Sequence, residues 1–191
     1  TASGTAVAGT YDVEVVDLAE NSIHRSRGFS SATSQIADGN LDITINGVTT
    51  GIVVQASNGN KSISDLADYI NANVNGATAY VLDTGSGSTP FRLMINADET
   101  GVSNGVSLSF APTGAGTTPD FVLVNGAVDA QLVFGGLTVQ RATNTVSDVI
   151  PGVTLELTAP TSGAAKITVS SDPDAMADAV ESFVDRSEEH T

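Results

Sequence analysis

The stretch "GNLDITINGVTTGIVV", residues 39–54, predicts a β-hairpin. Leu41, Ile43 and Ile45 alternate with polar residues, which is the period-two pattern of a strand that has one buried face. Asn46 and Gly47 follow, and this dipeptide favours a two-residue turn between antiparallel strands. The apolar residues after the turn supply the second strand, so we expect antiparallel β-structure here.

Similar strand patterns cover most of the chain. Short alternating or apolar segments are separated by Gly, Asn, Ser and Pro, the residues that turns require. The predicted strand segments are residues 11–16, 77–83, 91–96, 106–110, 121–126, 130–140, 152–157 and 166–171, and within 130–140 a glycine turn separates two strands. The predicted fold class is therefore mainly β, a β-rich α+β protein with antiparallel sheets.

Two short helices interrupt this pattern. Residues 62–73 open with Ser62, followed three residues later by Asp65, which predicts a capping box at a helix start. The second predicted helix begins in residues 172–184, where Asp172 can cap and Pro173 takes the first helical position.

Composition excludes several function classes. The 191 residues carry a formal net charge of −15, with seven scattered basic residues and no cysteine. Nucleic acids and anionic membranes need clustered cations, so neither is an expected partner. The lack of cysteine excludes thiol catalysis, thiolate metal sites and disulfides. No apolar run approaches the ~20 residues that span a membrane, and the first residues lack the basic and apolar regions of a cleavable signal peptide. The chain also lacks an initiator Met, so we expect a segment of a longer protein.

The histidines and glycine-rich segments do not predict a catalytic site. His24 and His190 do not lie at metal-ligand spacing from another histidine. No serine lies in a nucleophile-elbow motif. Residues 85–91 are rich in glycine but lack the lysine of a phosphate-binding loop.

Among the candidate catalytic residues, the acidic ones are the strongest, although the evidence for them is weak. Those in 17–21 and 96–101 lie near predicted turns, where a solvated surface position explains them, and those in 172–174 suit helix capping better than calcium binding. We predict no catalytic, cofactor-binding or metal-binding residues and no enzyme activity. A β-rich hydrolase with two facing carboxylates stays an alternative, which a structure can test.

Three segments carry a family resemblance: "GTYDVEVVDLA" (9–19), "GFSS" (28–31) and "TVSDVIPGVTLEL" (145–157). Together with the order of elements over about residues 8–185, they resemble the filament-capping hook-associated protein 2 family of the bacterial flagellum. Residues 41–101 are also similar to a motif that recurs inserted in flagellins. The resemblance implies two small antiparallel β domains, one inserted in the other. Residues 1–36 and 126–172 would form the discontinuous outer cap domain and residues 37–125 the inserted distal domain. Residues 173–191 would begin a helical leg region or be a non-native end.

The resemblance also implies a function. Family members form a cap at the filament tip, outside the cell, where it promotes ordered polymerisation of exported flagellin. The expected partners are flagellin subunits and further copies of the cap protein, and export would use the flagellar secretion apparatus. Because the terminal helical regions used for assembly are missing from this chain, and because copies with a charge of −15 repel one another, we predict that the chain alone is monomeric in dilute buffer.

A binding module for host mucin or glycans is the alternative function. Some family members are associated with adhesion to mucus, and a β-rich surface domain could serve that role. The chain has no Trp, three Tyr and six Phe. Because sugar recognition relies on exposed aromatic faces, this composition disfavours the alternative.

Overall fold

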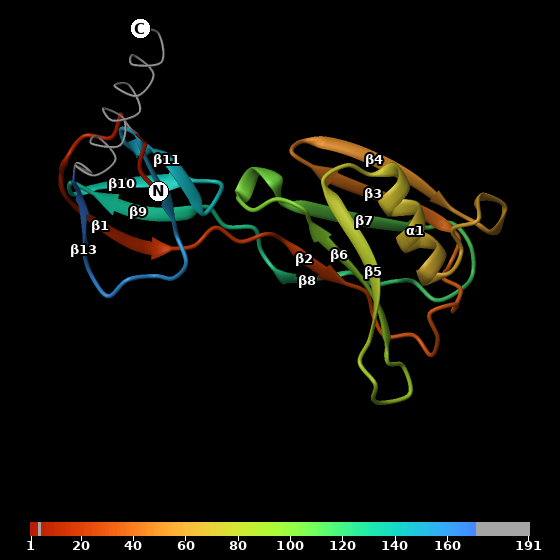
Figure 1. Ribbon diagram of the computed structural model, residues 1–191. Coiled ribbons are helices and arrows are strands. Elements are labelled where there is room, and N and C mark those ends of the chain that lie inside the picture. The colour runs from red at the N-terminus through yellow and green to blue at the C-terminus, as the bar shows by residue number, and fades with distance from the viewer. Residues whose placement is uncertain (4, 171–191) are drawn as a thin grey trace, which may run out of the picture.

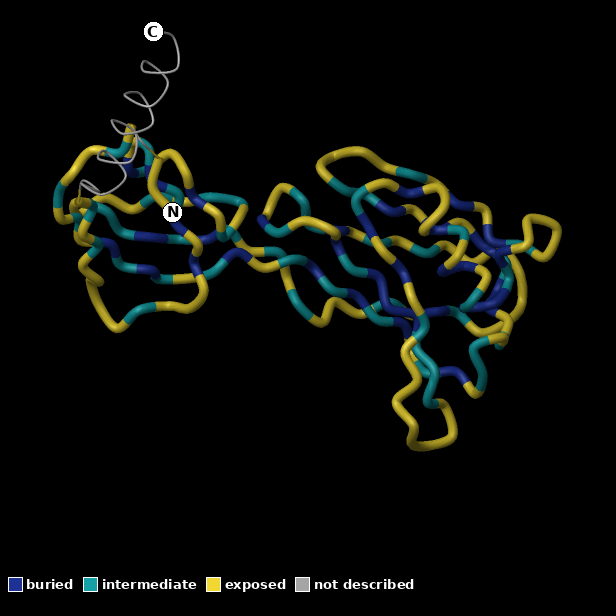
Figure 2. The backbone as a smooth tube through the Cα atoms, in the orientation of Figure 1, coloured by how far each residue is buried: buried dark blue, intermediate teal, exposed yellow. Residues whose placement is uncertain are grey.

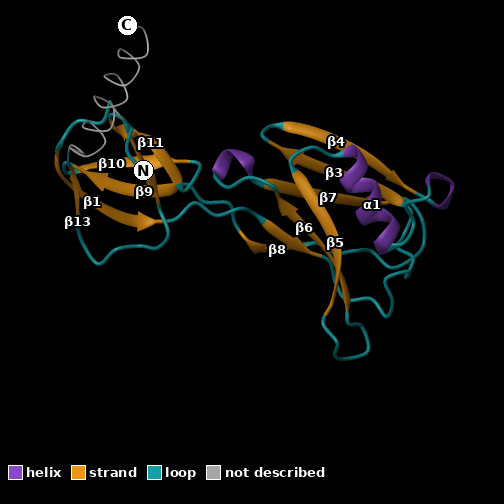
Figure 3. Ribbon diagram, in the orientation of Figure 1, coloured by secondary structure: helices purple, strands orange, loops and turns teal. Residues whose placement is uncertain are grey.

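The computed structural model describes residues 1–3 and 5–170. It is mainly β, which confirms the predicted fold class. Figure 1 shows two lobes joined by a narrow waist, and Figure 3 shows that strands dominate both lobes, whereas the described helical turns all lie in the second lobe.

The first lobe contains a four-stranded antiparallel sheet in the order β10-β9-β1-β13 and a hairpin of β11 and β12. Its strands are β1 (Gly9–Asp17), β9 (Ala130–Phe134), β10 (Leu137–Arg141), β11 (Thr145–Ile150), β12 (Val153–Glu156) and β13 (Ala165–Val169). Val13, Leu132, Ile150 and Leu155 belong to its buried core. Residues near the start of the chain thus form one core with residues more than a hundred positions later.

The second lobe contains two antiparallel sheets, in the orders β5-β6-β2-β8 and β4-β3-β7. Its elements are β2 (Ile23–Arg25), β3 (Gly39–Ile45), β4 (Val48–Val54), α1 (Ile63–Asn73), β5 (Ala77–Asp83), β6 (Phe91–Ala97), β7 (Val106–Pro112) and β8 (Val122–Asn125), with short 3-10 turns at Ala56–Asn58 and Val102–Asn104. Helix α1 contacts β5 and β6. Ile43, Leu66, Ile70, Leu93 and Ile95 belong to a second buried core, separate from the first.

Two local predictions are confirmed in this lobe. Ser62 caps α1: its hydroxyl accepts a hydrogen bond from the Asp65 backbone N–H, and the Asp65 carboxylate accepts one in return from the Ser62 N–H. Asn46 and Gly47 join β3 to β4 with positive φ angles of 49° and 74°. Both residues of a type I′ turn need this left-handed conformation, which asparagine and glycine adopt at low cost.

Backbone and side-chain hydrogen bonds hold the waist between the lobes. Glu20 and Val128 lie opposite each other in the two connecting segments, with N···O distances of 2.9 and 3.1 Å. A loop of the second lobe reaches the first lobe, where the Thr100 hydroxyl donates to the Ala142 carbonyl at 2.6 Å. The Gly101 N–H donates to the Glu20 carbonyl at 3.1 Å. The lobes are therefore in direct contact as well as linked by the chain.

One further local prediction is confirmed, and other elements differ from the prediction. A glycine turn at Gly135 and Gly136, with φ angles of 58° and 80°, divides residues 130–140 into β9 and β10, as expected. Strand β2 was not predicted, and it pairs with β6 and β8. The predicted helix at 172–184 lies outside the described residues.

Candidate functional site

His24 lies inside the second lobe and serves packing. It is 7% exposed on β2, opposite Ile95 of β6, and no hydrogen-bond partner reaches its Nδ1 atom. Burial lowers the pKa of the imidazole below its ordinary value of 6.5 because charging it would require desolvation. A buried neutral imidazole with no nucleophile or carboxylate bonded to it is not a catalytic base. His190 lies outside the described residues.

The acidic residues do not form a metal or catalytic centre in the described part of the chain. No group of three or more His, Asp or Glu residues there could hold a metal ion. The Glu20 carboxylate accepts from the Asn125 amide at 2.9 Å, and that of Asp98 accepts from the Thr78 hydroxyl at 2.6 Å. Residues 172–174 lie outside the described range. The acids near the waist are surface groups with hydroxyl and amide partners.

The glycine-rich segment is a hairpin tip. Gly85 and Gly87, with φ angles of 68° and 82°, turn the chain between β5 and β6. The Gly85 N–H donates to the Asp83 carboxylate at 2.8 Å. A carboxylate already occupies this donor, which does not suit a phosphate-binding loop.

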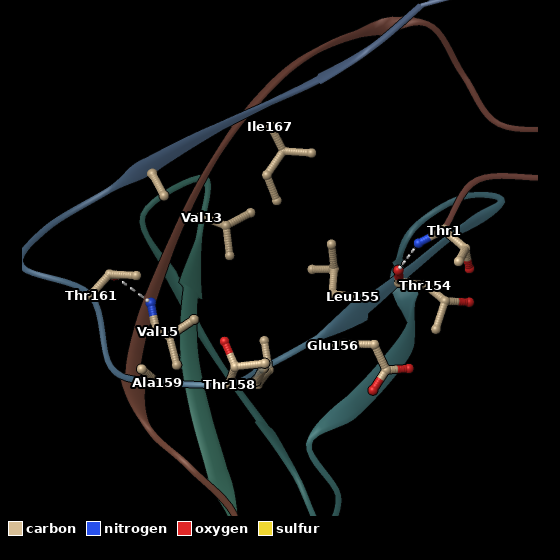
Figure 4. Close-up of a pocket in the computed structure, with 12 residues that line it drawn as sticks. Thr1, Val13, Val15, Thr154, Leu155, Glu156, Thr158, Ala159, Thr161 and Ile167 are labelled. Carbon is tan, nitrogen blue, oxygen red and sulfur yellow. Dashed lines mark hydrogen bonds between the residues drawn. The ribbon is translucent and has the colours of Figure 1, made fainter.

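The first lobe has an open cavity of about 340 Å³ between its sheet and strand β12. Figure 4 shows Val13, Val15, Leu155 and Ile167 directed into it, with Thr161 at the rim, where its hydroxyl accepts from the Val15 N–H at 3.0 Å. Glu156 is the one acidic side chain among the lining residues. An apolar cavity with a single carboxylate lacks the paired acid and base that hydrolysis requires.

The outer face of the sheet β5-β6-β2-β8 is the most distinctive surface. Residues that lie opposite each other on neighbouring strands share a face, and the strand register places Tyr80, Met94, Arg25 and Val122 in one row across all four strands. Leu82 and Arg92 form the adjacent pair. We call these six residues the arginine face.

The arginine face is accessible at both edges of its sheet. Tyr80 and Leu82 on β5 are each 41% exposed, and Val122 on β8 is 48% exposed. Strand β8 is an edge strand whose next residues, Leu123 and Val124, are both 54% exposed. Figure 2 shows exposed residues on both edge strands. Exposed apolar side chains beside an unpaired strand edge favour a protein-interaction site, although Met94 in the middle of the face is only 8% exposed.

Sequence reasoning missed this face. The Arg25 and Arg27 pair was visible in the sequence. The position of Arg92 beside it depends on β2 lying between β6 and β8, and a three-residue strand has no periodicity strong enough to predict that pairing.

The comparisons with known proteins agree with one another. The family model described as "Flagellar hook-associated protein 2 C-terminus" matches residues 127–186. A lateral flagellar hook-associated protein 2 of Vibrio parahaemolyticus is 32% identical over 204 residues, which cover 96% of this chain and 45% of that protein. The chain belongs to the flagellar hook-associated protein 2 family.

Other members of the family match in the same way. The hook-associated protein 2 of Escherichia coli is 27% identical over 161 residues, covering 78% of this chain and 34% of that protein. This chain therefore spans less than half the length of the curated relatives named here. Within the described residues, no helix has the length and apolarity needed to cross a membrane.

Solved structures of the family share the fold. The D1-D2-D3 domains of the flagellar cap protein FliD from Escherichia coli match 97% of this chain and 55% of that chain, with a TM-score of 0.82 and 26% identity. The D2-D3 domains of FliD from Serratia marcescens match 89% of this chain and 97% of that chain, with a TM-score of 0.75 and 26% identity. The similarity thus extends over both lobes.

Proposed function

We propose that this chain is a structural segment of the bacterial flagellar filament cap, which sits at the filament tip and promotes ordered polymerisation of exported flagellin. The observation that carries the proposal is the match of 97% of the chain to a flagellar cap protein at a TM-score of 0.82. In the whole protein, the partners would be flagellin subunits and other copies of the cap protein, outside the cell.

The form of the described chain suits a structural role without catalysis. Each lobe has its own buried core, and hydrogen bonds join the lobes at the waist. The described residues present no metal cluster, and their buried histidine has no catalytic partner. Shape and surface would therefore perform the function, and we infer that the chain is not an enzyme.

We also propose a division into two domains, the second inserted in the first. The inserted unit would run from about residue 20 to residue 128, because Glu20 and Val128 lie opposite each other where the chain leaves and re-enters the first lobe. The expectation drawn from the resemblance was 37–125. Phe29 and Ile36 pack in the second core, which favours the earlier start.

Complementation in cells that lack their own cap protein tests the function. The whole parent protein should restore filaments, whereas a parent lacking residues 1–170 should release unpolymerised flagellin into the medium. If both versions restore normal filaments, this segment is dispensable for assembly and the proposal is wrong.

A matched variant separates the contributions of the two lobes. Because Glu20 and Val128 are neighbours across an antiparallel bridge, a short turn can replace residues 21–127 without displacing the first lobe. A folded first lobe in this variant would support the proposed domain division. An unfolded one would show that the lobes are a single folding unit.

No specific observation favours the alternative of a mucin or glycan adhesin. Among the described residues, Tyr80 is the one aromatic side chain that belongs to the largely exposed class. A single exposed ring does not make the stacking platform that sugar recognition usually needs.

A further inference from the structure

Most basic side chains of the described residues form an ion pair with a carboxylate, but two do not. Four of its six basic side chains have a carboxylate partner: Arg27 with Asp120, Lys61 with Asp38, Arg141 with Asp148, and Lys166 with Asp12. Within the described residues, Arg25 and Arg92 have no carboxylate within 4.0 Å, although the whole chain has 22 acidic residues.

These two unpaired cations lie on the same surface. Arg25 and Arg92 both belong to the arginine face, among Tyr80, Leu82 and Val122. The Arg92 guanidinium has one contact, at 3.5 Å from the Ser26 carbonyl, which leaves most of its donors available. Arginine, tyrosine and methionine are enriched in protein interfaces, and this face carries all three.

The waist of the molecule has the opposite charge. Asp17, Glu20, Asp98, Glu99 and Asp129 lie in the chain segments that meet there, which are joined by the hydrogen bonds from the Gly101 N–H to the Glu20 carbonyl and from the Val102 N–H to the Asp129 carboxylate. None of the five forms an ion pair with a basic side chain of the described residues. We call these five residues the acidic waist.

We propose that the arginine face of one copy binds the acidic waist of a second copy of this chain. The unpaired arginines of the arginine face would form ion pairs with the carboxylates of the acidic waist, which have no basic partner within their own described chain. The proposal rests on the proposed function only in taking copies of the chain to be neighbours in the cap.

The attraction at this contact must exceed the electrostatic repulsion between two negatively charged chains. Two chains of −15 repel each other, but at physiological salt the Debye length is about 8 Å, so charges in direct contact are screened far less than distant ones. A small, polar interface of this kind is weak, and we expect a dissociation constant on the order of 1 mM. The chain is then monomeric in dilute buffer and associates when neighbours are held close together. The association should weaken at low salt, where the long-range repulsion is strongest.

A charge-exchange experiment on the 191-residue chain tests the contact. One variant carries Arg25→Glu and Arg92→Glu, and a second carries Glu20→Lys and Glu99→Lys. Self-association is measured by sedimentation over a concentration series at physiological salt, after circular dichroism has shown that each variant is folded. We expect each variant alone to show no measurable association over the concentrations at which the original chain associates, because like charges then face each other. An equimolar mixture should recover the association to within about threefold, because opposite charges meet again.

The matched control is Arg141→Glu with Lys166→Glu, both in the first lobe. It changes the net charge by the same amount as the arginine-face variant, so it tests whether position or total charge matters. Equal weakening in this control, or no recovery in the mixture, would overturn the proposal. Filament restoration by the parent protein is measured separately. Intact filaments together with a failed charge exchange would reject the contact and leave the proposed function standing.

Discussion

Gly101 lies at the waist in a conformation that other residues rarely adopt. Its φ of 97° and ψ of 149° fall in a region occupied almost entirely by glycine. A Cβ atom added there would lie 2.6 Å from Ala142 Cβ, 2.8 Å from Ala142 Cα and 2.9 Å from the Ala142 carbonyl oxygen. Two of these atoms belong to the backbone, so no side-chain rotation relieves the contact.

We therefore expect Gly101→Ala to destabilise the waist. Backbone strain alone costs about 1–3 kcal/mol. If the loop moves away to relieve it, the bonds from Gly101 N–H to Glu20 and from Thr100 to Ala142 are lost, at about 1 kcal/mol each. Either route gives a loss of about 1–3 kcal/mol in the free energy of opening the waist.

Hydrogen exchange at the amides of Gly101 and Val128 measures that opening directly. Gly126→Ala is the matched control, since an added Cβ there meets nothing within 4 Å and the residue lies in the same connecting region. We expect a loss of protection of at least about fivefold in Gly101→Ala alone. Equal protection in the two variants would show that the close approach to Ala142 does not hold the lobes together.

Three further changes have defined outcomes. Ser62→Ala should lower the free energy of unfolding by about 1 kcal/mol, because it removes the cap of α1 and a hydrogen-bond partner of Asp65. Urea unfolding measures this change, and an unchanged midpoint would contradict the prediction. Ser26→Ala should lower the free energy of unfolding by about 1–3 kcal/mol in the same assay, because the buried Leu93 N–H donates to the Ser26 hydroxyl at 2.9 Å and would lose its acceptor. The control is Ser57→Ala, in an exposed 3-10 turn. Because of His24, the free energy of unfolding should fall as the pH drops below 6.5, since the unfolded chain then binds a proton that the buried imidazole does not bind. His24→Gln should reduce this pH dependence between pH 7 and pH 5.5. An unchanged dependence in the variant would exclude His24 as its source.

Features that depend on neighbouring residues could be predicted from the sequence. The turn at Asn46 and Gly47 follows from two adjacent residues that tolerate positive φ. The start of α1 follows from Ser62 and Asp65, three positions apart. The alternation in β1 and β3 predicted which of their side chains are buried.

The tertiary structure decided the features that join distant residues. Strand β2 is three residues long, and its burial comes from β6 and β8, about 70 and 100 positions later in the chain. That pairing buries His24, begins the second lobe before residue 37, and sets Arg25 opposite Met94 and Val122. Local patterns do not show which sequence-distant strands become neighbours, because that order depends on the packing of the whole chain. The sequence alone therefore determined what kind of protein this is, and the long-range pairing determined which side chains share a surface.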